Sequence, residues 1–342
     1  MLRVAAIGSG FFAHFHYDAW QRIEGAEVVG LASLEEPQAR EVASKFGVPA
    51  VFTDVDRLLG ELKPDLVDII TPPESHLELV KKCAARKLNT ICQKPLAPTL
   101  TEAEELVSIA SAAGIDLIVH ENFRFQPWYR EIKRWIEEGR LGDLHCISFR
   151  LRPGDGQGPR AYLDRQPYFQ KMERLLIHET AVHWVDTFRF LMGRVTAVTA
   201  RLRKMNPVIA GEDAGYVIFE FANGSTGLFD GNRLNDHQAK IKRLTMGEAW
   251  VEGSAGVMRL DGFGRLWFAP HGGSEEQVTL YCDRESFGGS FGGDCVYNLQ
   301  SHVIEHYRNG RPLENLGPDY LNVYRIEEAI YRSSAEGRRI KL

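Results

Sequence analysis

Short apolar runs alternate with longer amphipathic stretches through the first third of the chain. The runs are rich in β-branched residues and predict strands, whereas the period of the stretches is typical of surface helices. The predicted strands are Arg3–Ile7, Glu27–Ala32, Leu66–Ile70, Asn89–Cys92 and Asp116–His120. The predicted helices lie near Phe11–Arg22, Pro37–Phe46, Ser75–Lys87 and Thr101–Ala113. This alternation predicts an α/β fold with a doubly wound parallel sheet.

The pattern changes after Glu121. Predicted helices at Trp128–Glu138 and near Arg174–Leu191 lie on either side of a loop from Arg152 to Pro167 that is rich in Gly, Pro and Arg. Strand-like runs separated by turn formers follow. They are Thr196–Arg203, Gly215–Phe221, Gly224–Gly231 and Ile241–Glu252, and helices near Asp294–Asn309 and Asp319–Glu336 come after them. We expect two domains, residues 1–121 and 122–342, the second an α+β domain with a large open, mainly antiparallel sheet.

Charge and cysteine usage narrow the class of protein. The 41 basic and 46 acidic residues are mixed along the chain and give a net charge of −5, so no basic stripe predicts a nucleic-acid partner. The five cysteines form no CxxC pair, which argues against a disulfide framework and a zinc site. They are Cys83, Cys92, Cys146, Cys282 and Cys295. No leader-like segment and no apolar run of about 18 residues is present, so we expect a cytoplasmic protein without a membrane partner.

A glycine turn between the first strand and the first helix predicts dinucleotide binding. The run Gly8-Ser9-Gly10-Phe11-Phe12-Ala13 matches G-x-G-x-x-G/A, in which glycines let backbone amides approach a pyrophosphate at a helix N-terminus. Ser33 ends the second strand, where a carboxylate would select NAD. Its hydroxyl permits a 2′-phosphate, yet the acidic Glu35 and Glu36 follow, so both NAD and NADP remain open.

Four motifs in this order resemble the Gfo/Idh/MocA family of sugar and polyol dehydrogenases. They are the glycine turn, Thr71-Pro72-Pro73-Glu74-Ser75-His76, Gln93-Lys94-Pro95 and His178-Glu179-Thr180-Ala181-Val182-His183. The resemblance implies a Rossmann domain followed by an open mixed sheet that often forms an oligomer interface, and hence a homo-oligomer, dimer or tetramer. It implies an oxidoreductase that transfers a hydride from a sugar or polyol carbinol to NAD(P)+.

The resemblance also assigns roles to residues. It places Lys94 and His183 at the nicotinamide and the reacting carbinol, with Glu179 completing a catalytic triad. The cofactor-binding residues it implies are Gly8, Gly10, Phe11, Phe12, Ser33, Thr71, Pro72, His76, Gln93 and Lys94. Two family acids have changed, because Gln93 replaces a glutamate and Glu179 an aspartate. Ala181 also replaces a glycine, which narrows the space beside the acid.

The chemistry fits these residue types. Glu179 and His183 stand at i and i+4 of a predicted helix, so they share one face. Histidine titrates near neutral pH, which makes His183 the natural general base for the hydroxyl proton. Lys94 follows the fourth predicted strand, at the carboxyl edge where such sheets bind ligands, and its ammonium can stabilise a developing alkoxide.

The predicted substrate contacts are Asn122, Arg124, Arg152, Gln157, His178 and His183. The stretch Glu121–Trp128 and the loop Arg152–Gln157 are most similar to sugar 1-dehydrogenases of the D-apiose type, so oxidation of an aldose at C1 to a lactone is our working choice. Structural alternatives stay open for several of these residues. They are a salt bridge for Arg124, a surface cap for His178 and an oligomer contact for the loop. The turn before His76 could line the nicotinamide pocket, or Ser75 could simply cap the helix that follows.

Three other functions compete with this interpretation. His178, Glu179 and His183 resemble a zinc-hydrolase motif, but five residues put the histidines about 140° apart on an α-helix, so we predict no metal site. The altered acids would suit a non-catalytic dinucleotide or sugar sensor. The same fold could also use its cofactor internally, as an isomerase or glycosidase.

Overall fold

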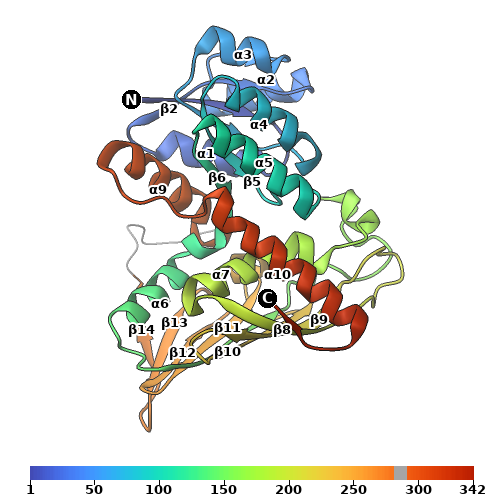
Figure 1. The fold of residues 1–342 in the computed structure, drawn as a ribbon, viewed down its shortest axis with the longest axis vertical. Coiled ribbons are helices and arrows are strands. Elements are labelled where there is room, and N and C mark those ends of the chain that lie inside the picture. Colours follow the sequence, from blue (N-terminus) through green and yellow to red (C-terminus); the bar gives the residue numbers. More distant parts are fainter. Residues whose placement is uncertain (281–290) are drawn as a thin grey trace. The chain divides into compact units, whose positions relative to one another are not determined.

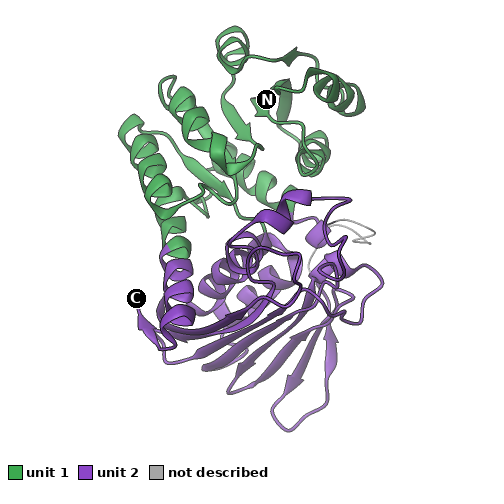
Figure 2. Cartoon of the chain, turned by 90° about the vertical axis from the view of Figure 1, so that its right-hand side faces the viewer, with its two compact units in different colours: residues 1–122, 296–324 green, residues 123–295, 325–342 purple. Residues whose placement is uncertain are grey.

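A computed structural model describes residues 1–280 and 291–342, so Cys282 lies outside the described residues. The chain forms two compact units (Figure 2). Unit 1 comprises residues 1–122 and 296–324, and unit 2 comprises residues 123–295 and 325–342. The first break falls beside the domain boundary predicted after residue 121, and the C-terminal segment is divided between both units.

Unit 1 is built on a six-stranded parallel sheet in the order β3-β2-β1-β4-β5-β6 (Figure 1). Its strands are β1 (Leu2–Ile7), β2 (Ala26–Ala32), β3 (Val51–Phe52), β4 (Leu66–Ile69), β5 (Asn89–Gln93) and β6 (Leu117–His120). The chain winds outward from β1 in one direction and then in the other, which is the doubly wound Rossmann order. The predicted fold class is confirmed for this half.

The helices of unit 1 are α1 (Ala13–Arg22), α2 (Glu36–Phe46), α3 (Val55–Leu62), α4 (His76–Ala84), α5 (Leu100–Ala113), α9 (Cys295–Asn309) and the first part of α10 (Gly317–Glu336). Side chains set several of their starts. Asp54 caps α3 by accepting from Arg57 N, and Thr99 caps α5 by accepting from Glu102 N. The sequence pattern did not reveal α3 or the two-residue β3, which are both short.

Unit 2 carries a nine-stranded sheet in the order β14-β13-β12-β11-β7-β10-β9-β8-β15. Its strands are β7 (Leu144–Leu151), β8 (Val195–Arg203), β9 (Ala214–Phe221), β10 (Thr226–Asn232), β11 (Gly247–Gly253), β12 (Gly256–Leu260), β13 (Leu266–Pro270), β14 (Glu276–Val278) and β15 (Ile340–Lys341). All neighbouring pairs are antiparallel except β7 with β10, which is parallel. This confirms the predicted mainly antiparallel sheet.

Helices cover one face of the unit 2 sheet, and the other face is open (Figure 2). They are α6 (Pro127–Glu137), α7 (Val182–Met192) and the second part of α10. Aromatic contacts fix α7 on the sheet, since the Trp184 ring lies 4.2 Å from that of Phe149 and the Phe188 ring 5.5 Å from that of Phe219. These side chains are almost fully buried and form the centre of the core.

Two predicted elements of unit 2 were wrong in detail. The stretch Ile241–Glu252 is not one strand, because the short helix α8 (Lys242–Thr245) precedes β11, and Met246 between them has φ 59°. The helix predicted near Arg174–Leu191 begins as a π-helical segment, Leu176–Ala181, before α7. A short stretch of mixed residues does not distinguish a strand from a single helical turn. The apolar period also does not show where a helix changes from α to π geometry, which adds one residue to the hydrogen-bonded turn.

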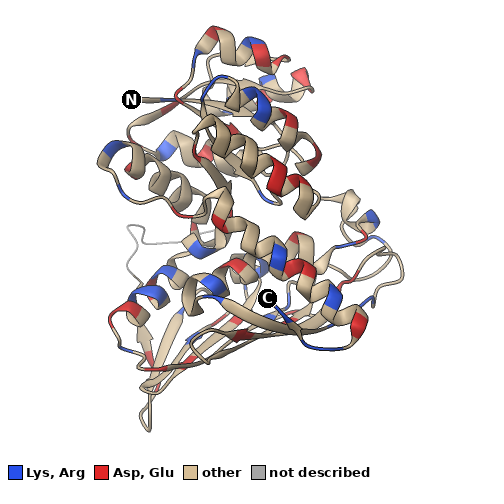
Figure 3. Cartoon of the chain, viewed as in Figure 1, with Lys and Arg blue, Asp and Glu red and all other residues tan. Residues whose placement is uncertain are grey.

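Charged residues of both signs are interspersed over each unit (Figure 3). No helix within the described residues has both the length and the apolar character to cross a membrane.

Candidate functional site

The glycine turn lies at the point where the strand order of unit 1 reverses. Gly8 N donates to Ala32 O at the end of β2. On the other side of β1, Ile70 follows the end of β4, and its N–H donates to Ile7 O. Gly8 has φ +123°, and a Cβ there would stand 2.8 Å from Ile70 O. Only glycine fits this position without strain, which leaves the amides at the start of α1 accessible to a pyrophosphate.

The residues after Gly8 complete the expected phosphate cradle. Apart from its own chain neighbours, no described residue has an atom within 4 Å of where a Gly10 Cβ would be, so the turn is open on that side. Phe11 is 48% exposed at the turn, and Phe12 precedes the helix as its N-terminal flank. Ala13 is fully buried in the core cluster beneath α1, as the small third position of the motif requires. The residues present therefore fit a dinucleotide.

Ser33 is joined to this turn. Its hydroxyl lies 2.8 Å from that of Ser9 and accepts from Glu35 N at 3.3 Å. The nearby Arg40 is engaged by Glu36, with Nη2 2.6 Å from Oε1. The end of β2 thus presents a serine hydroxyl and acidic side chains, with that arginine already paired.

His76 connects the two loops that follow β4 and β5. Its ring is fully buried, with Nε2 2.8 Å from Thr71 O and Nδ1 3.0 Å from Leu96 O. Burial lowers the pKa of His76 below its ordinary value. Ser75 does not cap α4, because its hydroxyl donates to Pro72 O and shares a second hydrogen bond with the Thr71 hydroxyl. His76 therefore holds the Thr71-Pro72 turn in place from within the core.

Lys94 follows β5 at the carboxyl edge of the sheet, as predicted. Its backbone N–H donates to Gln93 Oε1 at 2.7 Å, and the Lys94–Pro95 bond is cis. The loop is clamped at Ala97, whose N–H donates to Tyr324 Oη and whose carbonyl accepts from it. The Lys94 side chain is half-buried, while Gln93 is only 8% exposed.

In unit 2, His183 lies in the first turn of α7, and its imidazole stacks on Phe123. The two ring centroids are 3.8 Å apart and the planes differ by 4°. His183 is 7% exposed, and Thr187 donates its hydroxyl proton to His183 O one turn later. The stack fixes the plane of the imidazole, which is what a general base needs to meet a hydroxyl in one direction.

Glu179 lies in the π-helical segment, and its carboxylate is held by neighbours. Thr180 Oγ1 donates to Glu179 Oε2 at 2.6 Å, and Arg233 Nη1 lies 3.6 Å from the same oxygen. Arg233 is 2% exposed and also pairs with Asp155, at 2.8 Å from Nη2 to Oδ2. Our sequence analysis missed Arg233. Its signal was weak, an arginine just past a predicted strand, because its partners lie 53 and 78 residues away.

His178 is part of a second buried network, which joins the π-helical segment to α10. Its Nδ1 lies 2.7 Å from Oε1 of Glu327, which is 2% exposed. Tyr331 Oη accepts from His178 N at 3.3 Å and donates to Glu212 Oε1 at 2.7 Å. Burial raises the pKa of Glu212 above its ordinary value. His178 is therefore held by Glu327 rather than capping a surface.

Arg124 and Asn122, two other predicted substrate residues, are buried. Arg124 forms the salt bridge that the sequence left open, since Nε and Nη2 bind the two carboxylate oxygens of Asp186 at 2.8 and 2.6 Å. Arg124 is 7% exposed and Asp186 fully buried, so this bidentate pair belongs to the core. Asn122, the last residue of the first segment of unit 1, is 2% exposed.

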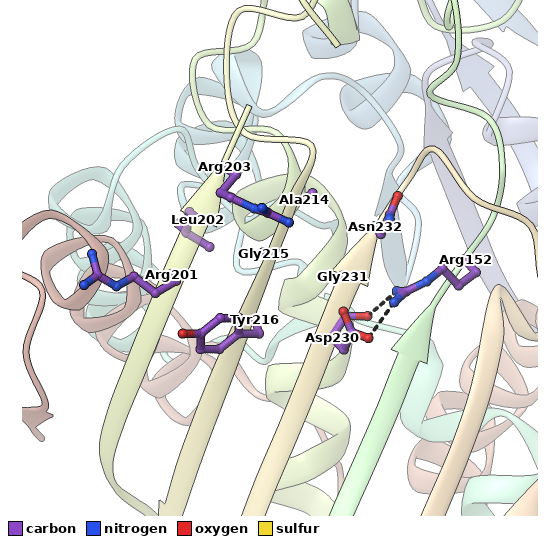
Figure 4. Close-up of a pocket in the computed structure, with 10 residues that line it drawn as sticks. All are labelled: Arg152, Arg201, Leu202, Arg203, Ala214, Gly215, Tyr216, Asp230, Gly231 and Asn232. Carbon is purple, nitrogen blue, oxygen red and sulfur yellow. Dashed lines mark hydrogen bonds and ion pairs between the residues drawn. The ribbon is translucent and has the colours of Figure 1, made fainter. Parts of the chain in front are cut away.

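Arg152 and Gln157 lie in the loop after β7. Arg152 Nη2 binds Asp230 Oδ2 at 2.5 Å, and Gln157 Nε2 donates to Leu234 O. Arg152 also lines a pocket of about 560 Å³ on the unit 2 sheet (Figure 4). Residues of β8, β9 and β10 form the rest of this pocket, and neither Glu179 nor His183 lines it. The pocket is thus separate from the predicted catalytic residues.

Across residues 1–280 and 291–342, no group of three or more His, Cys, Asp and Glu residues is arranged to hold a metal ion.

Comparison with known proteins places the chain. Residues 2–121 match the family described as "Oxidoreductase family, NAD-binding Rossmann fold", and residues 129–259 match the Gfo/Idh/MocA C-terminal domain. A D-apiose dehydrogenase from Paraburkholderia graminis is 32% identical over 99% of this chain and 89% of its own length. The chain belongs to the Gfo/Idh/MocA oxidoreductase family. The resemblance seen in the sequence, and with it an NAD-binding Rossmann domain, is confirmed.

Two more relatives of this oxidoreductase match along nearly all of its length. A D-apiose dehydrogenase from Rhizobium rhizogenes is 30% identical over 100% of the chain and 97% of its own. The crystal structure of an oxidoreductase from Agrobacterium radiobacter, in complex with NAD+, L-tartaric acid and magnesium, superposes with a TM-score of 0.89. The two sequences are 29% identical, and the superposition covers 99% of this chain and 98% of the Agrobacterium chain.

Proposed function

We propose that this oxidoreductase is an NAD-dependent dehydrogenase that oxidises C1 of an aldose, D-apiose foremost, to the lactone. The observation that carries the proposal is its similarity to two D-apiose dehydrogenases over at least 99% of the chain. Lys94 and His183, the two family residues suited to the chemistry, are both retained. NAD rather than NADP is supported by the acidic residues after Ser33, which would repel a 2′-phosphate.

We assign the proton steps to unit 2. His183, oriented by Phe123, takes the C1 hydroxyl proton, a role that typically contributes about 10²–10⁴ in rate. Glu179, held by Thr180 and Arg233, is the acid that completes the proposed catalytic triad. A carboxylate whose own donors are fixed stays in position as charge develops on the imidazole.

Unit 1 supplies cofactor binding and one positive charge. The Gly8 turn and the N-terminus of α1 would hold the pyrophosphate, and the Ser33 hydroxyl would meet the ribose. Hydride acceptance is the chemistry that NAD+ provides when bound. The Lys94 ammonium stabilises the alkoxide that forms at C1, a preorganised contact whose removal commonly costs about 3–4 kcal/mol.

The substrate contacts that we propose are Asn122, Arg124, Arg152, Gln157, His178 and His183. Arg124 and His178 are held by the buried carboxylates of Asp186 and Glu327. We therefore expect these two residues to fix the shape of the proposed substrate site rather than to bind the sugar hydroxyls directly.

The test is a substrate panel scored by absorbance of the reduced nicotinamide. D-Apiose, D-galactose and inositols are each offered with NAD and with NADP. We expect turnover with D-apiose and NAD that Lys94→Ala and His183→Ala abolish. Tight NAD binding without any turnover would contradict the proposal and support a sensor. Product formed without net cofactor reduction would support an internal redox cycle.

We further propose that the open face of the unit 2 sheet joins subunits of a homo-oligomer. Tyr216, Ile218 and Leu228 are 39–44% exposed on neighbouring strands of this face. Light scattering of wild type and Ile218→Glu tests this, and a monomeric wild type would contradict it. The reduced thiols of Cys83, Cys92 and Cys146 fit the cytoplasmic location that we propose.

A further inference from the structure

A chain of buried polar side chains links α1 to strands β4 and β5 of unit 1 and ends at the backbone of Lys94. His16 of α1 lies between Asp68 of β4 and Gln93 of β5, with Nδ1 2.9 Å from Asp68 Oδ2 and Nε2 3.0 Å from Gln93 Nε2. His16 and Asp68 are fully buried and Gln93 is 8% exposed. The His120 ring packs against His16 with centroids 4.0 Å apart. Polar groups this deep require mutually matched donors and acceptors.

Asp68 fixes one end of this chain. Its Oδ2 also accepts from Trp20 Nε1 at 2.8 Å and from Gln300 Nε2 at 3.4 Å. Because Oδ2 already accepts from these N–H donors, it meets His16 as an acceptor, and His16 Nδ1 carries the proton that it receives.

The backbone of Lys94 fixes the other end. Because Lys94 N–H donates to Gln93 Oε1 at 2.7 Å, the Gln93 amide cannot be flipped without opposing two donors. Its NH₂ group therefore faces His16. His16 Nε2 must then accept, which requires the neutral Nδ1-protonated tautomer.

A carboxylate at position 93 would set acceptor against acceptor at His16 Nε2. We propose that His16 is a positioning residue for Lys94, acting through the amide of Gln93, and that the amide stands at position 93 because neutral His16 needs a donor there. The functional part of this inference rests on the dehydrogenase function proposed above.

The first test reads the tautomer directly and needs no activity. Two-bond proton–nitrogen spectra of protein labelled with nitrogen-15 histidine report which ring nitrogen is protonated, and His16→Phe identifies the signal. We expect Nδ1 protonation in wild type and, near neutral pH, protonation of both nitrogens in Gln93→Glu. An Nε2-protonated His16 in wild type, or an unchanged spectrum in Gln93→Glu, would overturn the assignment.

The second test asks whether the network acts through Lys94. His16→Phe keeps the shape of the ring but removes both hydrogen bonds. We expect it to lower kcat and kcat/KM together by about tenfold or more, with NAD affinity near wild type. In a Lys94→Arg background the same change should add little further loss. Additive losses, or a parallel loss of NAD affinity, would show a merely structural role.

Tyr307→Phe serves as the control, because it removes a hydrogen bond to Asp116 in the same unit, and it should leave kcat unchanged. The two levels of the account fail separately. If no sugar is oxidised, the proposed function fails while the spectra still test the network. If turnover is normal but the tautomer is wrong, the positioning role alone fails.

Discussion

The imidazole of His183 lies flat on the ring of Phe123, with centroids 3.8 Å apart and planes within 4°. These residues are 60 positions apart in sequence, and the stack sets the direction in which the ring nitrogens of His183 point. A general base is effective when its lone pair meets the proton at hydrogen-bond distance, so orientation matters as much as basicity.

We expect Phe123→Leu to lower kcat by up to about tenfold, because an aromatic pair contributes about 0.5–1.5 kcal/mol beyond its buried area. Steady-state kinetics with the best substrate of the panel measures this. Phe268→Leu is the control, since Phe268 packs on Trp135, a different aromatic partner in the same unit. Equal losses in the two variants would mean that the effect is general packing.

Asp155→Ala should destabilise the protein by about 3 kcal/mol. The change removes the bidentate partner of the buried Arg233 guanidinium and leaves the more distant Glu179 carboxylate, 3.6 Å from Nη1, to balance its charge, and a poorly paired buried charge is costly. Urea unfolding measures the loss. Asp164→Ala removes an exposed pair with Arg160 and should cost no more than about 1 kcal/mol. Similar values for the two variants would contradict the role given to Arg233.

Gly8→Ala should abolish NAD binding. The new Cβ would meet Ile70 O at 2.8 Å, and alanine is strained at φ +123°. Titration of protein fluorescence with NAD tests this. Gly60→Ala is a matched control in the α3 helix, with nothing near its added Cβ, and should raise stability by about 0.5–1 kcal/mol with unchanged binding. Normal NAD affinity in Gly8→Ala would place the pyrophosphate elsewhere.

His76 predicts a pH dependence of stability. Burial lowers its pKa, so the native state binds this proton less well than the unfolded chain does. The stabilisation is complete above the unfolded pKa of about 6.5 and is lost as the pH falls through the lower native pKa. Thermal unfolding of wild type and His76→Gln should show a steeper decline toward acid pH in wild type. Parallel curves would argue that His76 titrates normally.

The sequence predicted what is local and periodic. The five strands around the glycine turn are buried apolar runs, and β1 with α1 is recognisable because Gly8 and Ala13 have fixed roles within a few residues. The stretch after Ile241 was wrongly predicted as a strand. It begins with the short helix α8, and Met246, which has a left-handed backbone conformation, separates that helix from β11.

In the candidate site, too, residues in local motifs could be predicted and residues with distant partners could not. Lys94, Glu179 and His183 could be singled out from spacing and resemblance. Arg233, Glu327 and Asp68 could not, because each acts on a residue at least 50 positions away and leaves no pattern in its own neighbourhood. The π-helical turn that carries Glu179 was also hidden, since apolar periodicity does not register where the hydrogen-bond pattern changes.

Isotope transfer from C1 of the sugar to NAD decides whether the enzyme is the proposed dehydrogenase. D-Apiose carrying deuterium at C1 is incubated with NAD and the enzyme, and the reduced cofactor is analysed by mass spectrometry. We expect one deuterium in each NADH formed, a slower turnover than with unlabelled sugar, and neither signal with His183→Ala. NADH that forms without deuterium, or product that forms without NADH, would rule out hydride transfer from C1.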